Sequence, residues 1–208
     1  LFRSKGGSSR TVLIFLPGGG GSRYERQNKE GNAFYDNVGR WGAKQGMVVL
    51  NVQRHPGKEW DDPGRDVAHV VQWTQENIAK YKGNPNRIFV WAHSAGNGPL
   101  GTYIGRPELW GPKGVGVTGA IFMSGQFNVA PLEIPGIANL PGPNEPGGQF
   151  YGAGTACGFK PPAGRAGGPP PPPPPTDQAT LVSRSSLPEF RKTKVKLLDR
   201  KSTRLNSS

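Results

Sequence analysis

One serine in this sequence has the neighbours that a catalytic nucleophile needs. Residues 88–91 predict a buried strand, and the small residues that follow in "AHSAGNG" predict a sharp turn into a helix, with Ser94 on the bend. Such a strained turn pushes a serine hydroxyl out of the sheet, and the residues two before and two after it must be small. Ala92 and Gly96 meet that requirement. The spacing predicts a nucleophile elbow with alanine at the first glycine of G-x-S-x-G; a chance small-residue turn is the alternative.

A glycine run follows an earlier apolar segment, as "PGGGG" at residues 17–21. Acyl transfer through a serine requires preorganised N–H donors for the developing oxyanion, and glycines let a backbone turn its amides inward. We therefore expect Gly19 and Gly20 to donate, with the N–H of Ala95 as their partner. A phosphate-binding loop is disfavoured because no G-K-[ST] follows the glycine run and no G-x-G-x-x-G opens a helix directly after this strand. A plain flexible loop stays open.

The sequence supplies no evident general base. Its three histidines are His55, His69 and His93, whereas the base of a strand-turn-helix serine hydrolase follows the nucleophile in the chain. His93 adjoins Ser94, so its side chain should diverge from the hydroxyl. His69 lies about 200° around a helix from Val67 and is expected to face solvent. His55, in a loop, is a candidate only for the substrate side.

Alternating strands and helices would position these residues. Apolar runs predict strands at 11–16, 46–52, 87–91 and 116–125. Helical spacing predicts three helices: one from Phe34 to a stop at Gly46, one that begins at a cap residue, Asp62, and one over residues 95–105. The inner stripe of the second helix is expected to be Val67, Val70, Val71, Thr74, Ile78 and Tyr81. Trp41 and Trp91 are expected in the core. This order predicts an α/β fold with a doubly wound, mostly parallel sheet.

Composition limits the remaining function classes. The 208 residues suffice for one α/β domain. The formal net charge is +12, but the basic residues are scattered, so we expect no nucleic-acid partner. No apolar run approaches a membrane span. Cys157 is the only cysteine, which excludes an intrachain disulfide. The compartment and the oligomeric state stay open.

Several stretches together resemble the α/β-hydrolase esterases. They are "VLIFLPGGG", "FYDNVGRWGAKQGMVVLNVQR", "DVAHVVQWTQENIAKYKGNPNRIFVWAHSAG" and "GAIFMSGQFN", and the likeness resumes at 151–152 and 183–198. The resemblance is to the carboxylesterase and hormone-sensitive-lipase-like branch, with feruloyl-esterase-like and kynurenine-formamidase-like enzymes. It implies that Ser94 attacks a small-molecule ester through an acyl-enzyme, without cofactor or metal. Two stretches depart from the family's pattern. Pro17 stands where the family usually has the histidine of H-G-G-G, and residues 51–60, "NVQRHPGKEW", differ from the family's usual sequence.

The chain is expected to divide into four parts. Residues 1–130 form the hydrolase core, 131–180 a largely disordered Gly/Pro-rich insertion, and 181–198 the next helix and strand of that core. Residues 199–208, "DRKSTRLNSS", match one reading frame of a common sequencing-library adapter. We therefore expect a truncated chain that ends before the acid and the histidine of the catalytic triad. Asp199 is then not the triad acid, and the chain is expected to be nearly inactive. The alternative is a non-catalytic hydrolase-like scaffold that presents the seven prolines at 169–175 to a partner.

Overall fold

The chain folds around one twisted, mostly parallel sheet. A computed structural model describes residues 1–3, 7, 9–18, 33–53, 61–125, 179, 183 and 193–200. Within them the strand order is β1-β3-β2-β4-β5-β6. The strands are β1 Phe2–Arg3, β2 Arg10–Leu16, β3 Val48–Asn51, β4 Gly83–His93, β5 Gly119–Met123 and β6 Lys196–Arg200. Only β1 pairs antiparallel, with β3, among the strands so described.

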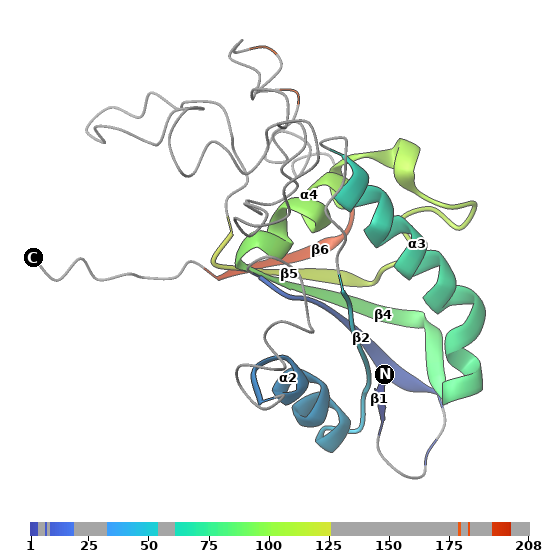
Figure 1. The fold of residues 1–208 in the computed structure, drawn as a ribbon. Helices are drawn as coiled ribbons and strands as arrows, with labels where there is room; N and C mark the ends of the chain where they lie inside the picture. The colour runs from blue at the N-terminus through green and yellow to red at the C-terminus, as the bar shows by residue number, and fades with distance from the viewer. Residues whose placement is uncertain are drawn as a thin grey trace, which may run out of the picture.

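Helices cover both faces of this sheet, as Figure 1 shows. Helix α2 Ala33–Lys44 lies on one face, and helices α3 Asp62–Asn77 and α4 Asn97–Gly105 lie on the other. Three short 3-10 turns complete these elements: η1 Ile78–Tyr81, η2 Ser94–Gly96 and η3 Pro107–Leu109. Strands alternating with helices on two faces confirm the predicted α/β, doubly wound fold.

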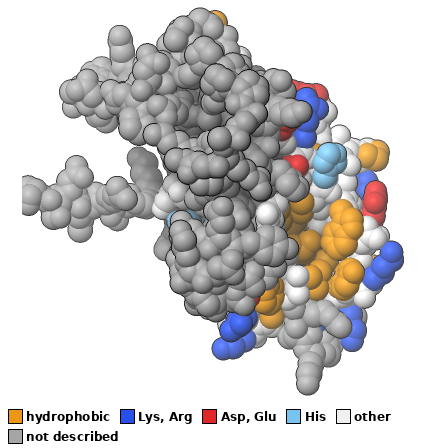
Figure 2. Space-filling view, in the orientation of Figure 1, with side chains coloured by type: hydrophobic (Ala, Val, Ile, Leu, Met, Phe, Trp, Pro, Cys, Tyr) orange, Lys and Arg blue, Asp and Glu red, His pale blue; other side chains and the backbone are white. Residues whose placement is uncertain are grey.

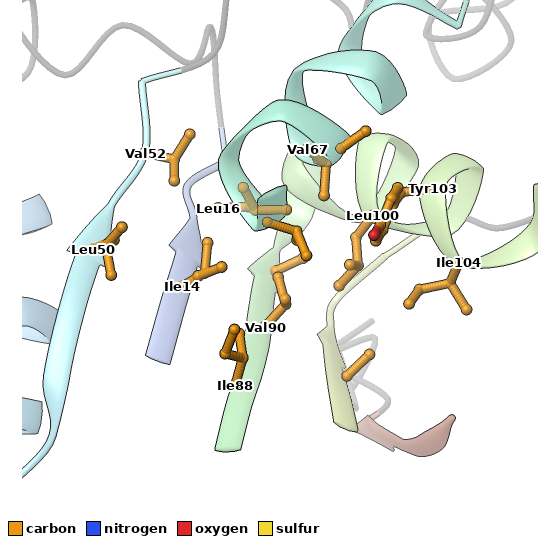
Figure 3. Packing of buried hydrophobic residues seen from close by; sticks show 14 of the residues in the cluster. Ile14, Leu16, Leu50, Val52, Val67, Ile88, Val90, Leu100, Tyr103 and Ile104 are labelled. Carbon is orange, nitrogen blue, oxygen red and sulfur yellow. The ribbon is translucent and has the colours of Figure 1, made fainter. Parts of the chain in front are cut away.

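The main hydrophobic core lies between the sheet and helices α3 and α4 (Figure 3). Alternate residues of each strand point to the same face, so every second position of β2, β3 and β4 contributes. The buried strand residues in this core include Ile14, Leu16, Leu50, Val52, Ile88 and Val90, and the helices add Val67, Leu100, Tyr103 and Ile104. The apolar runs that predicted the strands are therefore explained by burial on both faces, which is typical of parallel sheets.

Helix α3 begins and ends differently from the prediction. Asp61, not Asp62, is its N-cap residue, and its side chain makes no capping hydrogen bond. Instead the Asp61 carboxylate accepts a hydrogen bond from the Arg65 guanidinium over 2.7 Å. At the other end the chain tightens into η1, which turns Tyr81 away from the inner stripe to an exposed position. The stop predicted at Gly46 is confirmed, because its φ of +80° follows the last turn of α2.

Two further sequence predictions concern strand lengths. Strand β4 starts at Gly83, four residues before the strand predicted at 87–91, and its pairing with β2 has a register irregularity between Arg10 and Val12. The last strand runs through Leu198 to Arg200. The predicted insertion at 131–180 falls almost wholly outside the residues that the structure describes.

Surface features bear on the expected partners. On the face shown in Figure 2, the Lys and Arg side chains stand apart from one another rather than in one patch. Across the part of the chain that the structure covers, no helix has the length and apolar character required to cross a membrane.

Candidate active site

Ser94 lies at the turn between strand β4 and helix α4. Its φ is +50°, a left-handed conformation that is uncommon for any residue other than glycine. His93 before it is still extended, whereas Ser94 itself begins η2. The Ser94 side chain is exposed at the carboxyl end of β4. A nonglycine residue in this conformation carries strain of about 1–3 kcal/mol, which is typical of functional sites.

The small residues around Ser94 are required by space. A Cβ atom on Gly96 would lie 2.4 Å from the carbonyl oxygen of Leu16 and 3.0 Å from that of Pro17. Because both neighbours are backbone atoms, the contact could not be relieved by a side-chain rotation. Gly96 has a φ of −70°, so any residue could adopt its conformation but only glycine fits. Ala92 is fully buried on the preceding strand. The turn at Ser94 is therefore closely packed on both of its sides.

The loop after strand β2 reaches Ser94 directly. A Cβ atom on Gly18 would lie 2.7 Å from the Cβ of Ser94 and 3.0 Å from the carbonyl oxygen of His93. Gly18 belongs to the same glycine run as Gly19 and Gly20, the two residues predicted to donate to the oxyanion. Gly19 and Gly20 lie outside the described residues, so their donor role stays a prediction. Ala95, half-buried, directly follows Ser94 in η2.

The three histidines lie in different parts of the chain, and two of them, His69 and His93, belong to the described residues. The prediction that His69 faces solvent is confirmed on helix α3. His93 is half-buried, and its Nδ1 lies 3.2 Å from the position that a Cβ on Gly18 would occupy. Its ring therefore packs beside the glycine loop. His55 lies outside the described residues. Among the residues that are described, no three His, Cys, Asp or Glu side chains gather as a metal-binding group would.

Asn97 is a polar residue of the site that sequence reasoning missed. It is fully buried in the first turn of helix α4, three residues after Ser94. Its Nδ2 donates hydrogen bonds to the carbonyl oxygens of Ser94 and Met123, and its Oδ1 accepts one from the Met123 N–H. An asparagine within the small and apolar run "AGNGPLG" was the available signal.

The two tryptophans expected in the core line an apolar groove on the α2 side of the sheet. Trp41 is 49% exposed, so its assignment to the core was wrong. Its ring packs edge-on against Trp91, with 6.3 Å between the centroids, and Trp91 packs against Phe15 in the same way. The groove has a volume of about 380 Å³ and is lined by Thr11, Leu13, Trp41, Met47, Phe89, Trp91, Ile121, Met123 and Leu198.

Comparison with known proteins finds a partial similarity of the chain to an esterase. No protein-family model matches the chain. The fumonisin B1 esterase of Sphingopyxis macrogoltabida is 28% identical over 144 residues, which are 61% of this chain and 23% of that enzyme. The present chain thus spans about a quarter of that relative's length.

Solved esterase structures show a similar arrangement. An esterase of Pyrobaculum calidifontis aligns with a TM-score of 0.48 and 18% identity, over 62% of this chain and 41% of its own. Esterase 2 of Thermogutta terrifontis aligns with a TM-score of 0.47 and 18% identity, over 94% of this chain and 72% of its own.

The described residues form an α/β fold with a mostly parallel sheet and helices on both faces. A serine with a positive φ lies on its turn from strand β4 toward helix α4, which is the kind of position that the nucleophile takes in the α/β-hydrolase fold. The relative to which the sequence is similar is an esterase.

Proposed function

We propose that this chain carries the nucleophile of a serine hydrolase that acts on carboxylic esters. The observation that supports the proposal best is the exposed Ser94 at φ +50°, with Gly18 packed against its Cβ. A turn of this kind aims one hydroxyl away from the sheet, toward the carboxyl ends of the strands, where ligands bind in α/β folds. The similarity to an esterase points to the same chemistry.

In the proposed reaction, the Ser94 Oγ attacks the acyl carbon of the ester as its proton passes to a base. The carbonyl π electrons move to oxygen and give a tetrahedral oxyanion. Collapse of this intermediate re-forms the carbonyl and breaks the bond to the leaving alkoxide, which takes up the proton as an alcohol. Water then attacks the resulting Ser94 ester by the same steps, releasing a carboxylic acid and free serine.

Backbone donors would stabilise the two oxyanions. We assign this role to the N–H of Ala95, which follows Ser94 in η2, and to Gly19 and Gly20 in the loop that Gly18 leads into. Removal of one donor from such a hole typically reduces the rate by about 10² to 10³. No cofactor or metal has a step in this scheme.

We also propose that these 208 residues turn over esters very slowly. His69 faces solvent on helix α3, and His93 packs beside the glycine loop as the neighbour of Ser94. Neither position suits the base that must accept the Ser94 proton. Loss of a triad member reduces turnover by about 10⁴ to 10⁶, with residual catalysis from the oxyanion hole and substrate binding.

Hydrolysis of a short-chain p-nitrophenyl ester tests both parts of the proposal. The purified chain is compared with its S94A variant, and circular dichroism establishes that both fold. We expect slow hydrolysis above the S94A level. Equal rates for the two proteins would overturn the nucleophile assignment. Hydrolysis at a rate typical of enzymes, lost in S94A, would support the nucleophile but overturn the proposed slow turnover.

A further inference from the structure

The side chain of Asn97 bridges the ends of two neighbouring strands. Its exposure to solvent is 0%. The Nδ2 donates to the carbonyl oxygen of Ser94 over 2.7 Å and to that of Met123 over 2.9 Å. The Oδ1 accepts from the Met123 N–H over 3.2 Å. Both N–H donors and the carbonyl of the side-chain amide are therefore engaged by backbone groups.

These bonds continue the sheet beyond its last paired residues. His93 and Met123 are the final partners of the parallel strands β4 and β5. Past them both strands leave the sheet in the left-handed conformation, with φ +50° at Ser94 and +55° at Ser124. The Asn97 amide pairs with both backbone groups of Met123 and also with Ser94. It thus acts as an extra peptide group between the ends of β4 and β5.

The bridge bears directly on the strained turn. Ser94 has a left-handed conformation that L-residues rarely adopt. One of the three hydrogen bonds of the Asn97 amide goes to the Ser94 carbonyl oxygen, and a buried amide that lost such partners would be left unsatisfied. The Ser94 carbonyl, fixed by the shortest of the three, sets the direction of the peptide that follows the nucleophile.

The loop after β5 closes over this bridge. A Cβ atom on Gly125 would lie 2.5 Å from the Cγ of Asn97. The Asn97 amide is thus enclosed between the first turn of helix α4, the end of β5 and Gly125. The amide is therefore shielded from solvent, in agreement with its exposure of 0%.

We propose that Asn97 is a positioning residue for Ser94: its side-chain amide fixes the left-handed turn and so aims the Ser94 side chain. The consequence for ester hydrolysis rests on the proposed function. The effect on the side chain of residue 94 does not, because it follows from the hydrogen bonds alone.

A thiol placed at residue 94 reports its environment without requiring a catalytic base. The parent protein for the test is the full chain with S94C and C157S, so that residue 94 carries the sole thiol. The rate of alkylation by iodoacetamide is measured against pH. A thiol held at the start of a helix has a pKa below the usual value of about 8.5, and a one-unit rise in pKa lowers the thiolate fraction near neutral pH about tenfold.

The Asn97→Ala change in this parent is matched by Tyr103→Phe. Tyr103 is also fully buried on helix α4, and its hydroxyl donates to the Val115 carbonyl over 2.7 Å, away from the turn. We expect N97A to slow alkylation at neutral pH about tenfold, whereas Y103F leaves the rate within about twofold of the parent. Equal rates for N97A and the parent would overturn the proposal. Equal slowing by N97A and Y103F would overturn it too, because it would show only general destabilisation.

Asn97→Asp provides a second test if N97A does not fold. In N97D, a protonated carboxyl group at position 97 donates one hydrogen bond, whereas an ionised carboxylate would face the carbonyl oxygens of Ser94 and Met123. The N97D rate, relative to the parent at each pH, should rise as the pH falls; a flat ratio overturns the proposal. If these thiol effects appear but the chain with Ser94 hydrolyses no ester above S94A, only the proposed function fails.

Discussion

Gly18 and Ser94 approach each other so closely that a Cβ atom on residue 18 would lie 2.7 Å from the Cβ of the serine. The two residues follow β2 and β4, which are neighbouring parallel strands. Their contact brings the start of the glycine loop to the nucleophile. It therefore connects the two sequence features, the glycine run and the serine turn, from which the site was predicted.

The Gly18→Ala change should reduce both the stability of the fold and the accessibility of Ser94. The added methyl group meets the Ser94 Cβ and the backbone oxygen of His93, which cannot rotate away. Overpacking of this kind costs about 1–3 kcal/mol. Urea denaturation measures the loss of stability, and residual ester hydrolysis measures the effect on Ser94.

Gly111→Ala is the matched control for this prediction. The three heavy atoms nearest to a Cβ there all belong to the flexible Gln72 side chain, at 3.1 to 3.4 Å. We expect a change within about 0.5 kcal/mol. If G18A is as stable and as active as G111A, the loop does not approach Ser94 as described.

The strain at Ser94 predicts an unusual order of stability for its variants. Glycine adopts φ +50° without a Cβ clash, so S94G should be more stable than S94A by about 0.5–1 kcal/mol despite the greater entropy of its unfolded chain. Chemical denaturation of the two variants measures the difference. At the next position, A95G should instead lose about 0.5–1 kcal/mol. An S94G variant less stable than S94A would show that the turn is unstrained.

The Gly96→Ala change should destabilise the fold because helix α4 could no longer start against the end of β2. Its methyl group would lie 2.4 Å from the Leu16 carbonyl oxygen. We expect a loss of at least about 1–3 kcal/mol in the free energy of unfolding, measured by urea titration. A loss below about 0.5 kcal/mol would contradict the close crossing of β2 and α4.

Tyr103 predicts a loss of stability at alkaline pH. Burial raises the pKa of its phenol above the ordinary value of about 10. Above that ordinary value the unfolded chain releases the proton while the folded chain retains it, so unfolding becomes more favourable as the pH rises. Y103F lacks this effect. The stability advantage of the unmodified chain over Y103F should therefore shrink from pH 10 upward. A difference that stays constant over this range would contradict the burial of the phenol.

The elbow could be predicted from sequence because its signals are local. An apolar run ending in "AHSAG" specifies a buried strand and a tight turn through a few adjacent residues. The bridge by Asn97 could not be predicted in this way, because its partner Met123 lies on the next strand and their proximity depends on the register of the sheet. The exposure of Trp41 has a similar cause. Helical spacing identifies an apolar side of α2 but not how much of the sheet that helix covers.

The central claim is that Ser94 is the nucleophile, and selective covalent labelling tests it most directly. The folded chain and its S94A variant are treated with a fluorophosphonate, and the modified peptide is identified by mass spectrometry. If Ser94 is the nucleophile, we expect slow labelling that is confined to Ser94, is absent from S94A and is lost when the chain is unfolded in urea. Labelling spread over other serines, or equal in S94A, would contradict it.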